Sequence, residues 1–217
     1  MTINELHIKL DLYLENRIDI LKDTAKRCDV GYLFVDSLSG HCYLFDKNGN
    51  EDDVKKLMKI DNELFYNSDI SSIIIPDSIE SIEDKAFLNC ENLKSIIIPN
   101  SVKSIGDSAF EFCESLKSII IPDSVESIGN DAFAHCKSLK SIKIPNSVES
   151  IGNDVFWGCK SLKSIVIPDS VKSIGNRVFW SCDNLKSLTF KGKTIDQVKA
   201  MENYPFEIKD ESIIKCI

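Results

Sequence analysis

The sequence contains no long apolar stretch. No segment approaches the roughly 20 apolar residues that a membrane-spanning helix needs, and the first nine residues lack the basic start and apolar run of a secretory signal peptide. We therefore expect a cytoplasmic protein, or an extracellular one only if an export signal has been removed.

Histidine is scarce, and the glycine motifs of nucleotide-binding proteins are missing. The chain has three histidines, His7, His41 and His135, and none shares a local motif with a serine or cysteine nucleophile. Neither the G-x-x-x-x-G-K-[ST] loop nor the G-x-G-x-x-G fingerprint occurs. We expect no enzymatic activity, no catalytic residues and no cofactor.

The chain also has no excess of positive charge. It carries 26 basic and 34 acidic residues, for a formal net charge of −8, and its N-terminal third is the most acidic part. Phosphate binding needs clustered Lys and Arg, so nucleic acid is disfavoured as the main partner. A basic protein, or mimicry of nucleic acid, stays open.

A repeat dominates the rest of the sequence. Residues 72–186 contain five copies of a 23-residue template, S-I-x-I-P-[DN]-S-[IV]-x-S-I-[GE]-x-x-[AV]-F-x-x-C-x-[NS]-L-K. A fixed period in this range is typical of a solenoid, in which each turn, or rung, buries its apolar face against its neighbours. We therefore expect one elongated core, with scaffold at the invariant positions and functional information where repeats differ.

The second repeat illustrates the expected rung. Ile96 and Ile98 alternate like a strand with one buried face, and Pro99 ends the strand because it lacks a backbone donor. Gly106 marks a turn that we expect to have positive φ. Ala109 and Phe110 then form a short helical or 3₁₀ turn, with Phe110 filling the rung.

Cysteine occurs once per repeat. Two cysteines on adjacent rungs would lie about 5 Å apart, within disulfide range, but side chains in register point in parallel rather than toward each other. No C-x-x-C pair is present to suggest a metal site. We expect buried thiols that behave as small hydrophobic groups, and no metal.

The template resembles the BspA-like leucine-rich repeat family, also called the Treponema type. The family signature I-x-I-P-x-S-V-x-x-I-G-x-x-A-F-x-x-C-x-x-L matches residues 73–185 at nearly every marked position, with Glu83 replacing a glycine. The resemblance implies an α/β repeat solenoid with a parallel sheet on one face. It also implies a binding scaffold, often on microbial surfaces and also inside cells or in phage-related proteins, without shared catalysis.

Residues 1–71 are expected to cap the N-terminal end. Residues 3–27 have the apolar spacing of an amphipathic helix. Residues 31–35 and 41–45 predict a hairpin with a loop of about five residues. Residues 52–59 predict a short helix. A degenerate first rung follows, with Leu64 in the phenylalanine position, Asn67 in the cysteine position and Ile70 in the leucine position.

Residues 187–217 are expected to form the C-terminal cap. Ser187–Phe190 continues the strand pattern, and residues 192–201 predict a helix with Thr194 as its N-cap and Ile195, Val198 and Met201 on one face. Residues 204–206 and 213–214 should fold back over the last rung.

Two variable columns are candidate contact surfaces. On the outward strand face, apolar residues recur except at Lys143: Ile74, Ile97, Ile120, Lys143 and Val166. These residues form a contact patch for a partner. Alternatively, they are present for their β-propensity, or the N-terminal helix covers them. The second candidate covers two adjacent columns: Trp157 and Trp180 directly follow the repeat phenylalanine, and Phe112 and His135 lie one position further on. We call these four residues the aromatic column. We expect the two tryptophans to stack on the solvent side as binding residues, unless the C-terminal tail covers Trp180.

A third column is made of lysines, Lys94, Lys117, Lys140, Lys163 and Lys186. Like charges about 5 Å apart repel by about 1 kcal/mol in water. The column either faces an acidic partner or is a solvated rim whose charge is balanced elsewhere on the face.

These features predict a non-enzymatic protein-interaction scaffold. One alternative is a phage- or mobile-element-encoded inhibitor of a basic nucleic-acid enzyme, with Asp46, Glu51, Asp52 and Asp53 as contacts. A microbial surface adhesin is another, and self-association is a further possibility.

Overall fold

The computed structural model describes residues 32–36, 41–45, 51–53, 59–60, 65–67, 72–75 and 79–217. The chain forms two compact units, Met1–Met58 and Lys59–Ile217. The helix predicted for residues 3–27 lies outside the described residues, as does Ile70.

The first unit contains a three-stranded antiparallel sheet in the order β1-β2-β3, with β1 at Tyr32–Asp36, β2 at His41–Phe45 and β3 at Glu51–Asp53. The predicted hairpin is confirmed. Asp36 pairs with His41, so the loop is residues 37–40, one residue shorter than predicted. The predicted helix near residues 52–59 is wrong at its start, because Glu51–Asp53 pairs with β2. Pairing with β2 here decides the conformation of the Glu-Asp-Asp segment.

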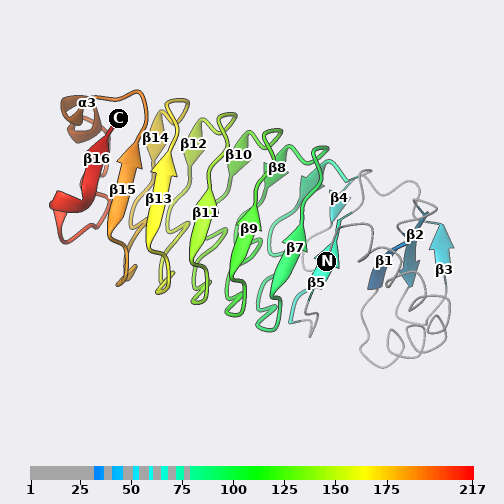
Figure 1. Ribbon diagram of the computed structural model, residues 1–217. Helices are drawn as coiled ribbons and strands as arrows, with labels where there is room; N and C mark the ends of the chain where they lie inside the picture. The colour runs from blue at the N-terminus through cyan, green and yellow to red at the C-terminus, as the bar shows by residue number, and fades with distance from the viewer. Residues whose placement is uncertain are drawn as a thin grey trace, which may run out of the picture. The chain divides into compact units, whose positions relative to one another are not determined.

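The second unit is a parallel β-solenoid (Figure 1). Its seven-stranded sheet is formed by strands of three or four residues. In chain order these are β5 Ser72–Ile74, β7 Ser95–Ile97, β9 Ser118–Ile120, β11 Ser141–Lys143, β13 Ser164–Ile167, β15 Ser187–Phe190 and β16 Ile214–Cys216. Those from β7 to β15 follow the Leu-Lys pair of a repeat. Neighbouring strands pair one repeat apart, as in Ile142 with Ile165. The predicted solenoid is confirmed.

A second parallel sheet runs along the molecule, where the sequence predicted a sheet on one face alone. Its six strands have two residues each: β4 Lys59–Ile60, β6 Ser81–Ile82, β8 Ser104–Ile105, β10 Ser127–Ile128, β12 Ser150–Ile151 and β14 Ser173–Ile174. Five of the isoleucines in this six-stranded sheet are buried: Ile82, Ile105, Ile128, Ile151 and Ile174. Each rung therefore contributes one short strand to each sheet.

The connections between the sheets are turns, so the helical or 3₁₀ turn predicted at Ala109–Phe110 is wrong. Two non-glycine residues in the second rung, Ser108 and Phe112, have left-handed φ of 54° and 58°. Such residues interrupt a right-handed helix. Among the described residues, helical structure is limited to α3 at Ile195–Lys199 and a 3₁₀ turn at Glu211–Ile213. The solenoid is mostly strand and turn rather than α/β.

Stacked phenylalanine rings run through the core. Phe65, Phe87, Phe110, Phe133, Phe156 and Phe179 lie on successive rungs, with ring centroids 5.0–6.0 Å apart. Each of these six side chains is at least 98% buried. About 3 kcal/mol of stabilisation for each buried ring makes this column a major contribution to stability.

The first rung is shifted by one residue from its prediction. Phe65, not Leu64, occupies the phenylalanine position, because it stacks on Phe87. Asn67 is not in the cysteine position either: its N–H donates to the Leu88 carbonyl, as the N–H of Asn89 does to that of Glu111 one rung on. The cause is a spacing of 22 residues, seen in the pairing of Ile60 with Ile82.

Glycine recurs in the turns for a steric reason. Gly106 does not have the predicted positive φ, which among the described glycines occurs at Gly158 and Gly192. A Cβ on Gly106 would instead lie 2.5 Å from the backbone nitrogen of Asp84 on the preceding rung. Glycine here allows adjacent rungs to approach closely.

The C-terminal cap matches its prediction in part. Thr194 is the N-cap of α3 and forms a capping box with Gln197. The helix ends at Lys199, and Ile195 is 41% exposed while Val198 is buried. Phe206 folds back onto Phe190 at 5.8 Å. Strand β16, which the sequence did not predict, extends the seven-stranded sheet beyond β15.

Candidate protein-binding surfaces

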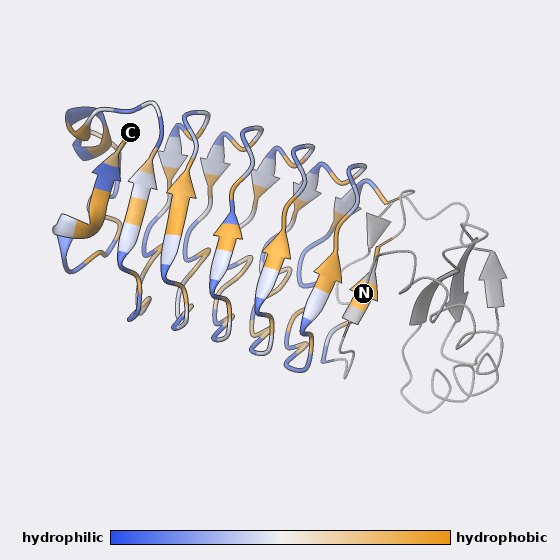
Figure 2. Ribbon diagram, in the orientation of Figure 1, coloured by the Kyte–Doolittle hydropathy of each residue, from blue (hydrophilic) through white to orange (hydrophobic). Residues whose placement is uncertain are grey.

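Apolar residues recur along the strands of the seven-stranded sheet, where the ribbon is orange in Figure 2, and some of them are exposed. Ile97, Ile120 and Val166 are 49%, 77% and 39% exposed, while the residues on either side of each in its strand point into the core. Ile97 and Ile120 are paired neighbours on β7 and β9. Ile74 lies in register with Ile97 on β5, but its side chain is outside the described part. We call Ile97, Ile120 and Val166 the apolar column.

Lys143 interrupts this column on β11, where it is in register with Ile120 and Val166. Its amino group lies 3.7 Å from a carboxylate oxygen of Asp123, and both side chains are 72% exposed. An ion pair this exposed contributes at most about 1 kcal/mol. The amino group of Lys143 is therefore free to exchange Asp123 for another acidic group.

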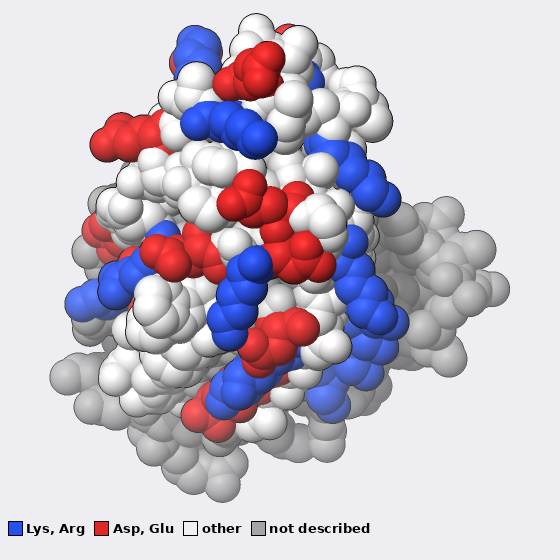
Figure 3. Space-filling view, turned by 90° about the vertical axis from the view of Figure 1, so that its left-hand side faces the viewer, with Lys and Arg blue, Asp and Glu red and all other residues white. Residues whose placement is uncertain are grey.

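The predicted lysine column borders the same sheet. Its members are all exposed: Lys94, Lys117, Lys140, Lys163 and Lys186. The N–H of Lys140, Lys163 and Lys186 each donates to the carbonyl of the lysine one rung before, at 2.9–3.3 Å. In Figure 3, blue side chains follow one another along the right-hand edge, whereas both signs of charge mix on the C-terminal end that faces the viewer.

The aromatic column is more tightly packed than the sequence suggested. The rings of Phe112 and His135 stack with centroids 4.6 Å apart, and His135 contacts Trp157 at 4.7 Å with a tilt of 54°. The guanidinium of Arg177 lies 5.7 Å above the Trp157 ring. The predicted stack of Trp157 on Trp180 is absent from the described ring contacts, because Trp157 packs on His135 and Arg177 instead.

Trp180 is the exposed member of this column. Its side chain is 47% exposed, so the C-terminal tail does not cover it. Phe112, His135 and Trp157 are each partly buried. Trp180 is therefore the member of the aromatic column best placed to enter a partner.

An acidic pair lies beside the aromatic column. Asp154 is 4% exposed, and one of its carboxylate oxygens accepts a 2.8 Å hydrogen bond from Arg177, while the other has no partner in the structure. Burial raises the pKa of Asp131 to about 6, and repulsion from Glu111 and Asp154 adds to this. Burial also lowers the pKa of His135. The sequence analysis did not single out this pair, although Asp131 and Asp154 occupy a position that varies among repeats.

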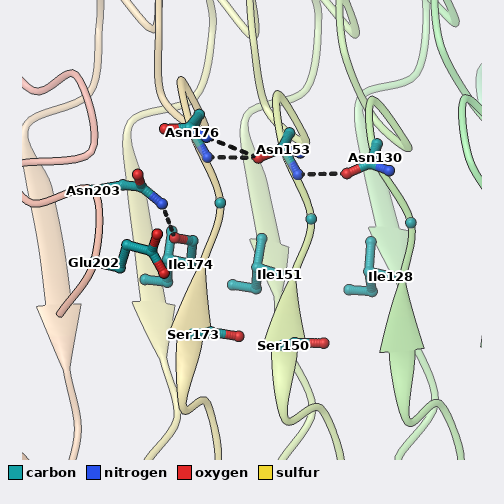
Figure 4. A pocket seen from close by; sticks show the side chains of 13 residues that line it. Ile128, Asn130, Ser150, Ile151, Asn153, Ser173, Ile174, Asn176, Glu202 and Asn203 are labelled. Carbon is teal, nitrogen blue, oxygen red and sulfur yellow. Dashed lines mark hydrogen bonds between the residues drawn. The ribbon is translucent and has the colours of Figure 1, made fainter.

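A polar hollow of about 430 Å³ lies on the side of the six-stranded sheet (Figure 4). Its walls are glycines, serines, isoleucines of the sheet and the asparagines Asn130, Asn153 and Asn176, and the tail residues Glu202 and Asn203 also line it. The amide oxygens of Asn130 and Asn153 accept from the backbone N–H one rung on, both at 2.8 Å. The Asn203 amide donates to the Ile174 carbonyl at 3.0 Å and thus caps the sheet edge. Because these hydrogen bonds join neighbouring rungs, we attribute the polar groups of the hollow to the stacking of the rungs.

The cysteine column consists of free thiols, as predicted. None of these buried cysteines forms a disulfide bond: Cys90, Cys113, Cys136, Cys159 and Cys182. Each thiol donates to the carbonyl of a phenylalanine on the preceding rung at 3.0–3.3 Å. Burial raises the pKa of Cys182 to about 12. The thiols of this column are therefore unreactive, and each adds one hydrogen bond between neighbouring rungs.

Within the described residues, no three His, Cys, Asp or Glu side chains lie close enough together to hold a metal ion. None of the described helices has the length and apolar character needed to cross a bilayer.

Comparison with protein families decides the identity of the repeat. The family described as the BspA type leucine rich repeat region matches residues 58–186 and 106–210, with six copies. The chain belongs to this family. Comparison with curated proteins found no match.

Solved structures agree with this assignment. A leucine rich cell surface protein from Faecalibacterium prausnitzii is 31% identical with a TM-score of 0.62, over 75% of this chain and 41% of that one. The chain thus spans about two fifths of that protein's length. The leucine rich repeat protein of T. pallidum is 25% identical with a TM-score of 0.54, over 70% of this chain and 78% of that one. The pneumococcal vaccine antigen PcpA, at 22% identity and a TM-score of 0.54 over 76% of this chain and 51% of that one, shares the fold.

Proposed function

We propose that this BspA-type repeat protein is a non-enzymatic protein-binding module whose main contact surface is the apolar column. The observation that carries the proposal is the exposure of Ile120, 77%, next to Ile97 at 49% on the neighbouring strand. Parallel sheets usually bury both faces. Branched apolar side chains that project from such a sheet into solvent are the kind of surface that a partner covers.

The scaffold under this surface supports the same proposal. Ile119, in β9, and Ile121, which follows it, are 4% and 2% exposed, so the segment that presents Ile120 is anchored in the core on both sides of it. A contact surface that is already ordered loses little conformational entropy on binding. The column therefore needs only modest contact area to bind a protein.

The aromatic column provides a second contact. Trp180 is exposed, whereas Phe112, His135 and Trp157 pack against each other. Tryptophan is enriched among the residues that dominate binding energy. We therefore place Trp180 at the edge of the interface and treat the other three as its support.

The inhibitor and adhesin hypotheses are narrower versions of this proposal. The F. prausnitzii relative is described as a cell surface protein, which supports testing adhesion. Glu51, Asp52 and Asp53, the predicted inhibitor contacts, lie in β3 of the first unit, and Asp46 is outside the described residues.

The test is quantitative capture of proteins from lysate and culture medium of the source organism. Three baits are compared: wild type, the triple variant I97S/I120S/V166S, and the control I195S/I217S, which removes exposed apolar groups (41% and 74%) from the cap instead. We expect a specific partner to be lost with the triple variant and kept with the control. Equal capture by all three would contradict the proposal. Light scattering of each bait identifies self-association.

A further inference from the structure

The lysine column is a row of five like charges that have no internal partner. In the described part of the chain, none of its five amino groups takes part in an ion pair or a hydrogen bond. Elsewhere, lysines on successive rungs are compensated: Lys137 lies 2.5 Å from Glu114, and Lys172 lies 2.8 Å from Glu149. The lysine column is thus a row of positive charge, without ion-pair partners, on a chain whose net charge is −8.

The lysine column runs parallel to the apolar column. On each rung the lysine precedes the outward strand residue by three positions, as Lys117 precedes Ile120. Three residues of extended chain span at most about 10 Å, so the backbones of the two columns lie within about 10 Å of each other. Both follow the rung spacing of about 4.8 Å, so the lysines extend over about 19 Å.

The opposite side of the apolar column has a different character. Asn100, Asp123, Asn146 and Asp169 follow the prolines there and are all exposed. The apolar column on the sheet is therefore flanked in the chain by a basic row before the strands and by an acidic or amide row after them. This order makes the surface asymmetric and restricts the orientation of a partner.

We propose that the lysine and apolar columns together bind an acidic amphipathic helix of a partner protein, with its carboxylates on the lysines and its apolar stripe on Ile97, Ile120 and Val166. The inference rests on the proposed function and names the class of partner. A helix is about 10 Å across, which is wide enough to cover both columns, and about 13 residues of helix span 19 Å. Lys143, between Ile120 and Val166, receives a further acidic side chain.

Other anionic partners fit this surface less well. Asp123 and Asp169 border the apolar column on its far side, and each side chain is 72% exposed. These carboxylates repel the headgroups of an anionic bilayer and the phosphates of a nucleic acid. An apolar row also offers nothing to a phosphate backbone. A protein segment that carries negative charge on one side, and none on the other, is complementary to all three rows.

The experiment uses two synthetic helical peptides that share the same leucine stripe, one flanked by glutamates and the other by lysines. Binding to the full chain is measured by fluorescence anisotropy at low and moderate salt. The column variant K117Q/K140Q/K163Q is compared with K103Q/K137Q/K172Q, which removes the same charge elsewhere. Circular dichroism verifies that both variants are folded.

We expect the glutamate peptide to bind about tenfold more tightly than the lysine peptide, since three exposed ion pairs at a few tenths of a kcal/mol or more each give that ratio. The column variant should lose about tenfold in affinity and most of the salt dependence. The control variant should stay within about twofold.

Several outcomes overturn the inference. Failure of the glutamate peptide to bind, equal binding of the two peptides, or equal losses in both variants would each do so. If anionic vesicles or an oligonucleotide depend on the column more strongly than the peptide does, the partner class is wrong. If both peptides bind equally but I97S/I120S/V166S releases them, the proposed function stands and only the acidic partner fails. If the triple variant releases neither peptide nor captured protein, the proposed function fails too.

Discussion

At the scale of single residues, aromatic side chains in this protein have two distinct roles. Phe133 is fully buried between Phe110 and Phe156, with centroids 5.4 and 6.0 Å away. Trp157 is partly exposed and contacts His135 and Arg177. The first kind of residue determines stability, and the second kind belongs to the surface.

This difference predicts the effect of two alanine substitutions. Phe133→Ala should lower the free energy of unfolding by about 3–5 kcal/mol, because it opens a cavity in a column that cannot collapse. Trp157→Ala should cost about 1 kcal/mol. Urea unfolding followed by circular dichroism measures both. Equal losses would show that Trp157 belongs to the core.

Asp131 gives a pH-dependent prediction. Its pKa is raised to about 6 from 3.8, first by burial and then by Glu111 and Asp154, with Arg177 opposing and Asp107 adding a little. The raised pKa means that the folded state holds this proton more tightly than the unfolded chain. The contribution of Asp131 to stability is therefore fully present below about pH 3.8 and is lost as the pH rises through about 6.

Asp131→Asn should then be more stable than wild type above pH 6, with the difference shrinking toward zero near pH 4. Asparagine tolerates the left-handed φ of 54° at this position. Unfolding curves of both proteins between pH 4 and pH 8 measure the difference. A difference that stays constant over this range would exclude the titration of Asp131 as its cause.

At the scale of the element, the close approach of backbones on adjacent rungs limits which residues a turn can hold. A Cβ on Gly152 would lie 2.8 Å from the backbone nitrogen of Asn130 and 2.9 Å from the carbonyl carbon of Gly129. Neither atom can move without moving the preceding rung. The glycine is thus required by packing, since its φ is not left-handed.

Gly152→Ala should therefore destabilise the protein by about 1–3 kcal/mol, in the range of overpacked positions. The matched control is Ser150→Ala on the same rung, an exposed position where the change should stay within about 0.5 kcal/mol. Thermal unfolding of the two variants gives the comparison. A neutral Gly152→Ala would mean that adjacent rungs are less closely packed than the structure shows.

The parts of the rung that the sequence predicted are those with an alternating apolar pattern. Ile96, Ile98 and Phe110 are buried as expected, because burial follows directly from periodicity. The second sheet was missed, since strands of two residues such as Ser104–Ile105 are too short to show any alternation. Phe65 was placed one residue off because an irregular first rung cannot be aligned by period alone.

The candidate surfaces were predictable in composition but not in packing. The exposure of Ile97 and Ile120 followed from strand alternation. The contact of Trp157 with Arg177 did not, since it depends on the buried carboxylate of Asp154, which holds the guanidinium at 2.8 Å. The contacts of side chains at variable positions depend on local geometry, which a repeat template does not encode.

At the scale of the whole molecule, stability is a sum of contacts between neighbouring rungs. Each rung from β7 to β13 contacts only the one before and the one after through its paired strands. Removal of one complete repeat leaves the same kinds of contact in place. The solenoid should therefore tolerate a change in length in steps of one period.

Deletion of residues 118–140 removes one repeat and joins Lys117 to Ser141 in phase. We expect a folded, monodisperse protein whose denaturant m value is lower by roughly one seventh, in proportion to the surface lost. Deletion of residues 118–134 instead breaks the register and should prevent folding. Equal behaviour of the two deletions would contradict a nearest-neighbour solenoid.

The most direct test of the central claim, that the apolar column is a protein-binding surface, is the dissociation constant of a captured partner. It should be measured for wild type, for I97S/I120S/V166S and for I195S/I217S. We predict that the triple variant loses at least about tenfold in affinity, since burial of even one such side chain contributes about 1.5–3 kcal/mol, while the control keeps the wild-type value. Unchanged affinity in a folded triple variant would show that the partner binds elsewhere.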